Sequence, residues 1–349
     1  MPRSRGAAAL SAGVGAALIA GGLFAPSALL FDARLPLDLQ NTTWTMSDPG
    51  GVADGEPAPV TRQLHMDLRS PADEDTVSVR VGDSLRAGEA DTDFDNLVTA
   101  STWSFSMNRR SGEVEQPAQL QSVMAMPAAD VAIDGVWLKF PTDVKRQAYD
   151  VFDPTLRASV AAEFVGEEEM RGRKVYRFYQ QVDPANLAQQ FADDRNTTYL
   201  LPEGDTPADG ASEGGTSEGG AEELSGEQPE KPPAAPERAY LFHSAERELL
   251  VDQATGVVVG MNEQVDDYYG DAAGRGLRNV VKYDAAADAN QVDALLEELD
   301  GVVPAGRVRT LSWAAIGVGA ALVLLALLTA LFGRRSRAVA RPGRAVAAG

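Results

Sequence analysis

The sequence predicts an α+β protein in which a mainly antiparallel β domain, a meandering sheet or a barrel, lies between two terminal transmembrane helices. Long apolar stretches occupy residues 6–31 and 311–332, and short segments that alternate apolar and polar residues lie between them. A helix rises about 1.5 Å per residue and a bilayer core is about 30 Å thick, so roughly 20 apolar residues can cross it. Both stretches are long enough.

The charges at the two ends predict the orientation of these helices. The tails, residues 1–5 and 333–349, hold seven arginines and no acid, whereas the rest of the chain has 24 basic and 51 acidic residues, a net charge of −27. Short basic tails stay in the cytoplasm. The sequence therefore predicts a two-pass protein of the cytoplasmic membrane, with both termini cytoplasmic and residues 32–310 outside. Arg307 and Arg309, just before the second stretch, argue weakly for the reverse.

A cleaved signal peptide is the alternative interpretation of the first stretch. The apolar core of a signal peptide is usually about 7–15 residues long. The run in this chain covers 26 residues, from 6 to 31, which favours an uncleaved anchor.

The composition of the outer region excludes several classes of function. The chain contains no cysteine, so neither disulfides nor thiolate metal sites are available. Its two histidines, His65 and His243, are too few for the usual zinc site. The strongly acidic balance excludes nucleic acid as a partner, because phosphate contacts need a basic surface. We expect no metal and no cofactor.

Alternation with a period of two residues predicts the strands, and one stretch is typical of a disordered insertion. A turn is expected at residues 70–75 between the first two strands. Residues 203–237 are rich in Gly, Ser, Glu and Pro and bury too little apolar surface to order, so we expect a disordered excursion from a single domain. The expected strands are residues 64–68, 77–81, 103–107, 136–140, 174–178, 249–252 and 257–259.

Helical periodicity is rarer in the outer region. Val292, Leu295, Leu296 and Leu299 share one helical face and predict a short helix before the second membrane stretch. A second helix is expected from Asp183-Pro184 through Leu187 to Phe191, with Asp183 as its cap and Pro184 in the first helical position.

Candidate chemistry is sparse, and we predict no catalytic, cofactor-binding or metal residue. The alternating carboxylates of residues 91–96 begin like a calcium loop, but Asn96 and Thr102 replace the required Gly and Glu, so an acidic surface loop is expected. Residues 167–169 are interpreted as a solvated acidic turn. Residues 266–269 are interpreted as a sheet edge, with a surface that faces a ligand as the alternative. His65 and His243 are interpreted as ordinary strand residues. No nucleophile elbow, HExxH motif or phosphate loop is present.

Several ordered segments, together with the two terminal helices, resemble actinobacterial envelope proteins of the PorA-type porin family, long a domain of unknown function. The resemblance spans about residues 35–332 and implies no catalytic residues. Asp153-Pro154 and Thr255-Gly256 fit as turns, and Tyr149, Phe152, Tyr176 and Phe178 as core aromatics. At the level of topology alone, the layout also resembles class B scavenger receptors. The segments are residues 102–112, 135–141, 149–154, 172–178 and 251–258.

Four functions follow from this layout. The first is a non-enzymatic envelope protein whose outer domain binds or conducts an apolar or amphipathic ligand, such as a wall lipid, through an elongated apolar cavity that opens toward the membrane. The second is a scaffold or regulatory subunit of an envelope complex that contacts other envelope proteins. The third is a wall-active hydrolase, which needs converging carboxylates with perturbed pKa values. The fourth is a literal pore.

Overall fold

The computed structural model describes residues 3–30, 33–89, 95–122, 128–201 and 236–338. The helices are α1 Arg3–Leu30, α2 Leu187–Gln190, α3 Ala289–Val302 and α4 Ala305–Ala338, with a short 3-10 turn, η1, at Asp194–Asn196. The strands are β1 Thr43–Asp48, β2 Val52–Ala53, β3 Glu56–Pro57, β4 Val60–Ala72, β5 Thr76–Ala87, β6 Leu97–Asn108, β7 Ala118–Ser122, β8 Ala129–Val131, β9 Tyr149–Asp153, β10 Ala158–Met170, β11 Arg173–Asn186, β12 Thr197–Leu200, β13 Glu237–Asp252, β14 Val258–Gly270 and β15 Gly276–Ala287.

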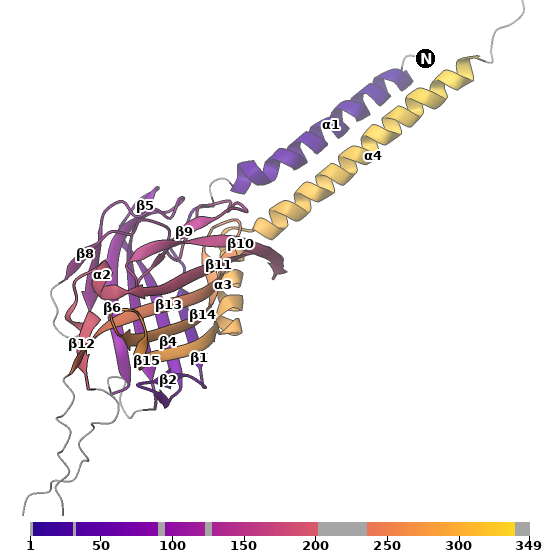
Figure 1. The fold of residues 1–349 in the computed structure, drawn as a ribbon. Coiled ribbons are helices and arrows are strands. Elements are labelled where there is room, and N and C mark those ends of the chain that lie inside the picture. Colours follow the sequence, from indigo (N-terminus) through magenta and orange to yellow (C-terminus); the bar gives the residue numbers. More distant parts are fainter. Residues whose placement is uncertain (1–2, 31–32, 90–94, 123–127, 202–235, 339–349) are drawn as a thin grey trace, which may run out of the picture.

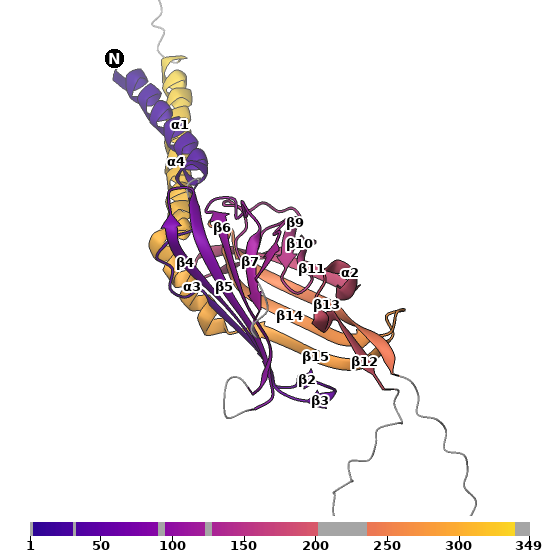
Figure 2. The ribbon, with the colours of Figure 1, turned by 90° about the vertical axis from the view of Figure 1, so that its left-hand side faces the viewer.

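The two long apolar helices, α1 and α4, lie side by side and extend away from the sheet (Figures 1 and 2). Residues Ala8–Leu30 and Ala305–Ala330 are long and apolar enough to cross a bilayer, which suggests membrane anchoring. The helix α4 starts six residues before the expected position 311. It starts directly after Pro304, whose missing N–H would be unsatisfied at a helix start in any case.

The described strands form one 15-stranded sheet, in agreement with the predicted antiparallel fold. The strands β4 to β8 make one meander, and β9, β10, β11, β13, β14 and β15 make a second. The strand β1 pairs with β4 on one side and β15 on the other, and so joins the two meanders into a continuous sheet. The sheet curves strongly, so that its two halves face each other (Figures 1 and 2).

The alternating segments lie in strands where the sequence predicts them. In β5, Val77, Val79 and Val81 are buried while the residues between them are more exposed. The predicted strands at 64–68, 77–81, 103–107, 174–178 and 249–252 are confirmed, although the turn expected at 70–75 is shorter, because β4 continues to Ala72. Phe152, Tyr176 and Phe178 are buried core aromatics, as expected.

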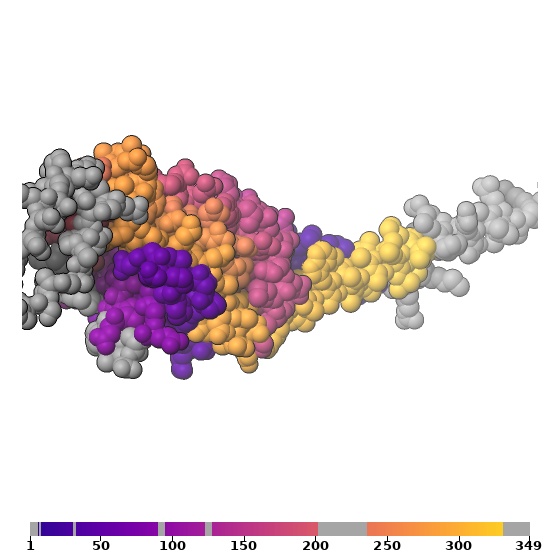
Figure 3. All heavy atoms as spheres, turned by 60° about the horizontal axis from the view of Figure 1, so that its bottom comes forward, coloured from indigo at the N-terminus to yellow at the C-terminus, as the bar shows by residue number. Residues whose placement is uncertain are grey.

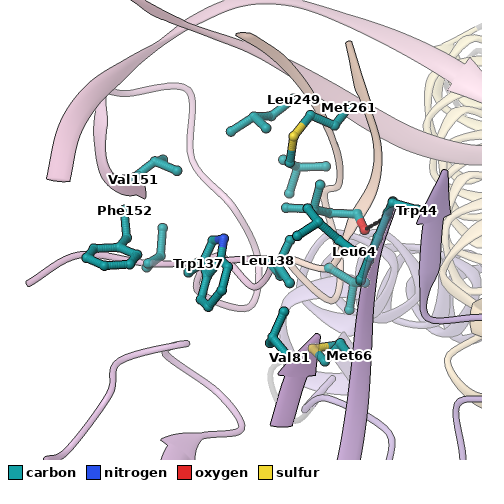
Figure 4. Close-up of a cluster of buried hydrophobic side chains, with 14 of the residues drawn as sticks. Trp44, Leu64, Met66, Val81, Trp137, Leu138, Val151, Phe152, Leu249 and Met261 are labelled. Atoms are coloured by element: carbon teal, nitrogen blue, oxygen red, sulfur yellow. Dashed lines mark hydrogen bonds between the residues drawn. The ribbon is translucent and has the colours of Figure 1, made fainter. Parts of the chain in front are cut away.

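The prediction of a strand at residues 136–140 is wrong. This segment makes only isolated bridges, one from Val136 to Val151 and one from Lys139 to Val257, and Leu138 has a φ of +60° that no strand allows. It runs instead through the interior, where the ring centroids of Trp137 and Trp103 are 5.6 Å apart. Figure 4 shows Trp137 and Leu138 between side chains from both halves of the sheet. The alternating sequence of residues 136–140 therefore belongs to a segment that is buried by both halves of the sheet, and not to a strand with one exposed face.

The helix predicted from Asp183-Pro184 is also wrong, because both residues belong to β11. They lie at a bulge where the register with β13 shifts between Val182 and Ala185, and a proline is tolerated in such a place because no ladder N–H is lost. Only the single turn α2 follows, and the side chain of Asn186 caps it by accepting from the N–H of Ala188. The other predicted helix is confirmed: α3 buries Val292, Leu295, Leu296 and Leu299.

The expected disordered insertion, residues 203–237, lies almost wholly outside the described residues. The strands on its two sides, β12 and β13, pair antiparallel with Thr197 opposite Tyr240. The chain therefore leaves and re-enters the same sheet.

The two ends of the sheet differ in what surrounds them. At the helix end, the backbone N–H of Leu35 donates to the carbonyl of Arg109, and the side chain of Arg309 donates to Gln253. The opposite end, where β5, β12 and β14 end at Ala87, Leu200 and Gly270, is called the distal end below. Figure 3 shows the broad strand-rich body narrowing to the helix pair on one side.

Candidate functional site

A cavity of about 260 Å³ lies within the curved sheet near its distal end. Its wall is contributed by both halves of the sheet and by the segment from α2 to η1. The apolar part of the lining is formed by Leu85, Val98, Trp103, Leu120, Leu187, Phe191, Leu241, Val265, Val280 and Val281. Charged side chains interrupt this surface in two places, which we call the floor (Arg62, Asp83, His243, Arg247 and Asp267, with Asp153, Gln180 and Glu263 behind them) and the rim (Arg157, Asp193 and Arg195).

The floor contains a buried ion network that links the two halves of the sheet. The Arg62 guanidinium from β4 donates to Glu263 Oε2 of β14 at 2.7 Å and to both carboxylate oxygens of Asp83. The Arg247 side chain from β13 donates to the same Glu263 oxygen at 3.1 Å and also to Asp153. Tyr283 completes the network by donating to Glu263 Oε1. One carboxylate therefore holds two arginines, each with about 5% of its surface exposed.

These contacts keep the buried carboxylates ionised. Burial alone would raise the pKa of Asp153, but the charges of Arg247 and His243 outweigh burial and hold it well below its ordinary value. The pKa of Glu263 is lowered in the same way, because Arg62 and Arg247 outweigh the effect of burial. A hydrolase of the two-carboxylate kind needs one acid held protonated. Neither Asp153 nor Glu263 meets that requirement.

His243 lies between two carboxylates and is not an ordinary strand residue. Its Nδ1 is 2.6 Å from Asp267 Oδ1, directly opposite on β14, and its Nε2 is 3.2 Å from Asp153 Oδ2. Burial by itself would lower the pKa of His243, but the charges of Asp153 and Asp267 outweigh burial and raise it to about 9. The ring is therefore an imidazolium at neutral pH, with both nitrogens donating.

The rim is more exposed and contains two arginines that share one acid. Asp193 accepts from Arg195 at 2.9 Å and from Arg157 at 3.4 Å. The guanidinium carbon of Arg157 lies 3.6 Å from the ring centre of Phe191, a cation–π contact. The rim is therefore a polar lip held against an aromatic side chain.

The interior at the helix end is packed, which corrects the expected apolar cavity that opens toward the membrane. Trp44, Trp137 and Phe140 fill this part of the described structure, each no more than 4% exposed. Arg173 is fully buried there, pairs with Asp252 through two hydrogen bonds and donates to the carbonyl of Val303 between α3 and α4. The 260 Å³ cavity is at the opposite end.

The candidates singled out in the sequence have mixed outcomes. The acidic loop at 91–96 lies mostly outside the described residues. Residues 167–169 belong to strand β10 rather than a turn, and Glu167 pairs with Arg146 and Lys174. Residues 266–269 belong to β14, between β13 and β15, and so are not at a sheet edge; Asp267 and Tyr269 do line the cavity. His65 accepts or donates one bond with Thr43. No group of described His, Asp and Glu residues is placed to hold a metal ion.

Reasoning from sequence missed Arg62, Arg247 and Glu263, although a signal for them exists. Arg62 lies two residues from both Val60 and Leu64, and therefore on the same inward face of β4. Arg247 lies in the same way between Ala245 and Leu249 on the inward face of β13. Glu263 is likewise in phase with Met261 and Val265. A charged side chain at an inward-facing position needs a partner of opposite charge in the core, because an unpaired buried charge is very costly in free energy.

Comparison with known proteins places the chain in a family. The sequence model of the family described as "Porin PorA" matches residues 7–328. A protein named "Porin PorA" from Corynebacterium resistens is 27% identical over 192 residues, which cover 44% of this chain and 46% of that protein. Another of that name from Corynebacterium amycolatum is 24% identical over 136 residues, 37% of this chain and 35% of that protein. The matched part thus spans less than half the length of these relatives. Because the family match extends over nearly the whole chain, this protein belongs to the PorA porin family.

Proposed function

We propose that this protein is a membrane-anchored cell-envelope protein whose distal cavity binds an amphipathic ligand, such as a wall lipid. The observation that carries the proposal is a cavity of about 260 Å³ with apolar walls and a buried polar floor, within a sheet whose helix end is densely packed. Small-molecule sites are typically mostly apolar, with a few well-placed polar groups that orient the ligand.

The position of the cavity determines how such a ligand would enter. With the sheet outside the cytoplasmic membrane and both termini in the cytoplasm, as the charged tails favour, the distal end faces away from the bilayer. The ligand would then come from the wall side and not directly from the outer leaflet. This differs from a tunnel that leads down to the membrane.

A pore through the sheet of one chain has little support in the packing. A water-filled path would have to pass Trp44, Trp137 and Phe140, which are at most 4% exposed. Removing such side chains from a core costs several kcal/mol each, typically about 3–5. The packing of these described side chains therefore argues against a conducting path through the interior of one chain.

A scaffold is the second candidate function, and one surface favours it. An outer groove of about 630 Å³ runs across β11, β13, β14 and β15 next to the loop after β1. Asp183, Glu246, Asp266 and Asp284 line it, with Lys282 as the single base among its lining residues. The groove would suit a basic segment of another envelope protein.

The binding proposal is tested by identifying what the full-length protein carries. The chain is extracted in a mild detergent, and bound small molecules are identified by mass spectrometry. Val280→Trp, at a half-buried lining position, fills the cavity, whereas Val165→Trp adds the same bulk at an exposed position outside it. We expect an amphiphile on the wild type and on Val165→Trp, and its loss from Val280→Trp. Equal occupancy of both variants, or none on the wild type, would contradict the proposal.

A further inference from the structure

Arg157, on the rim of the distal cavity, carries a charge that is only partly compensated. Its Nη2 lies 3.4 Å from Asp193 Oδ2, whereas Arg195 holds the same carboxylate through two shorter bonds of 3.0 and 2.9 Å. Asp194, the next acid along the chain, forms no ion pair with either arginine within the described structure. Asp193 is therefore bound mainly to Arg195, and Arg157 has one long contact to a shared anion.

Two nitrogens of the Arg157 guanidinium have no hydrogen-bond partner among the described residues. Nη2 donates to Asp193, so Nε and Nη1 are the unpaired ones. Neither is closed off from solvent, because every buried side-chain nitrogen or oxygen without a partner lies elsewhere in the described structure. The ring of Phe191 covers one face of the guanidinium, 3.6 Å from its central carbon. A stacked guanidinium donates from its edge, so this arrangement leaves two accessible donors.

The rim is also where the cavity reaches solvent. Arg195 lines the cavity with 51% of its side-chain surface accessible, and Arg157 lines it with 15% accessible. Burial lowers the pKa of the Arg157 guanidinium below its ordinary value; the charge of Asp193 opposes this effect, and the charge of Arg195 adds to it. A second anion beside Arg157 would stabilise its charge, and water would screen that attraction less than on an open surface.

The floor of the cavity does not compete with the rim for an anion. Arg62 already pairs with Asp83 and Glu263, and Arg247 pairs with Glu263 and Asp153. An anion at that depth would meet these carboxylates at contact distance, which costs free energy. The rim, in contrast, has two arginines for one acid.

From this arrangement we infer that the distal cavity takes an amphiphile with one anionic head group. Carboxylate or phosphate oxygens of the head accept from Arg157 at the rim, and the apolar chain lies along the wall formed by Leu241, Val265 and Val280. The inference rests on the proposed function and makes it more specific, because it assigns the charge of the head group and the part of the cavity that holds it.

Trp103 provides a readout inside the cavity, because it lines the wall. The full-length chain is placed in nanodiscs of zwitterionic lipid with Trp313→Phe, which removes the exposed tryptophan of α4 that a membrane-dissolved probe would reach. Three probes whose chains end in bromine are titrated at pH 7: 8-bromooctanoate, 8-bromooctyl phosphate and methyl 8-bromooctanoate. Bromine quenches a tryptophan that it touches. The same titrations on Trp103→Phe show how much of the quenching comes from the cavity.

We expect each anion to half-quench Trp103 at a concentration free in water about tenfold lower than that of the ester, since a charged hydrogen bond at a partly exposed position is worth about that factor. Arg157→Gln removes the charge and should abolish this preference. Arg278→Gln is the matched control and should keep it, because Arg278 also stacks on an aromatic ring, that of Tyr269 at 5.2 Å, but is not among the residues that line the cavity. The three probes on the unsubstituted rim test the inference on their own if Arg157→Gln does not fold.

The outcomes separate this inference from the proposed function. If the ester quenches as well as both anions, the anionic head is wrong while the amphiphile site stands. If Arg157→Gln keeps the preference, or Arg278→Gln loses it equally, Arg157 does not recognise the head and the inference is overturned. A preference for only one anion supports the inference and identifies the head as a carboxylate or a phosphate. If no probe quenches Trp103, both the inference and the proposed function are overturned.

Discussion

Arg247 and Glu263 face each other on neighbouring strands, and His243 faces Asp267 in the same way four residues along. Both pairs point inward, and apolar side chains lie between them on the same inward face of each strand. Ion pairs in such places stabilise only when every partner is present, because removal of one leaves a buried charge without compensation, at a cost of about 3–5 kcal/mol. The floor of the cavity is therefore a fixed polar arrangement that orients donors.

The charge of His243 predicts a pH dependence of stability. The pKa in the folded protein is about 9, against an ordinary value of 6.5, so the folded state binds the proton more tightly. The stabilisation is fully present below about pH 6.5, and it is lost as the pH rises through 9. The shift corresponds to a contribution on the order of 3 kcal/mol. In His243→Gln we expect a Tm well below that of the wild type at pH 6, and a smaller difference at pH 10.

Thermal unfolding of both full-length proteins in nanodiscs, followed by circular dichroism at the two pH values, measures this difference. His65→Gln is the control, since His65 lies on the surface beside Thr43. A constant difference between His243→Gln and the wild type from pH 6 to pH 10 would show that the imidazole is neutral in the fold.

How much the sequence could predict differs from residue to residue. Alternation identified the strand that contains Val77 to Val81, and helical spacing identified α3, because in both the residues on one face are apolar. The segment around Trp137 also alternates apolar and polar residues, yet it runs through the core, where Trp137 packs against Trp103. The spacing of apolar residues along a segment does not reveal whether its other face is also covered. The contacts of His243 with Asp153, 90 residues away in sequence, depend on the sheet pairing and could not be predicted locally.

At the level of elements, α1 and α4 approach each other through glycine. A Cβ on Gly15 would lie 2.6 Å from the carbonyl oxygen of Gly319, and one on Gly22 would lie 2.7 Å from the carbonyl oxygen of Ser312. Real Cβ atoms almost never come so close, so these positions set the distance between the helices. Inside a bilayer the hydrophobic effect does not drive helices together, because lipid tails are as apolar as the side chains. Close van der Waals packing through small residues then holds a helix pair together.

Gly15→Leu should therefore separate α1 from α4. The matched control is Gly21→Leu in the same helix, where a Cβ would meet nothing within 4 Å. Because the chain has no cysteine, spin labels can be placed on Leu10→Cys and Leu327→Cys alone, two exposed positions in α1 and α4. We expect a longer and broader distance distribution for Gly15→Leu and an unchanged one for Gly21→Leu. Unchanged distances in both variants would exclude this glycine contact.

At the scale of the whole molecule, the helices and the cavity are at opposite ends of one curved sheet. Arg173 ties the helix end together, because its side chain joins Asp252 at the end of β13 to the carbonyl of Val303 just before α4. The sheet and the base of α4 are thus one packed unit. This arrangement holds the distal cavity at a fixed distance from the membrane anchor.

The orientation of this unit relative to the membrane can be measured by cysteine labelling. A single cysteine at Val165, an exposed position on β10, should react with an impermeant maleimide on intact cells. A cysteine appended after Gly349 should react only after the cells are permeabilised, since the arginine-rich tail is expected in the cytoplasm. Labelling of the tail but not of Val165→Cys on intact cells would reverse the topology.

Amphiphile binding in the distal cavity is tested most directly with an alkyl ester that carries a photoreactive diazirine in its chain. The full-length protein in nanodiscs is irradiated with this probe, and the modified residues are mapped by peptide mass spectrometry. Binding in the distal cavity predicts labels near Leu241, Val265 and Val280, and their loss in Val280→Trp. Labels confined to α1, α4 and the segment around Trp137, with the distal strands unmodified, would contradict it.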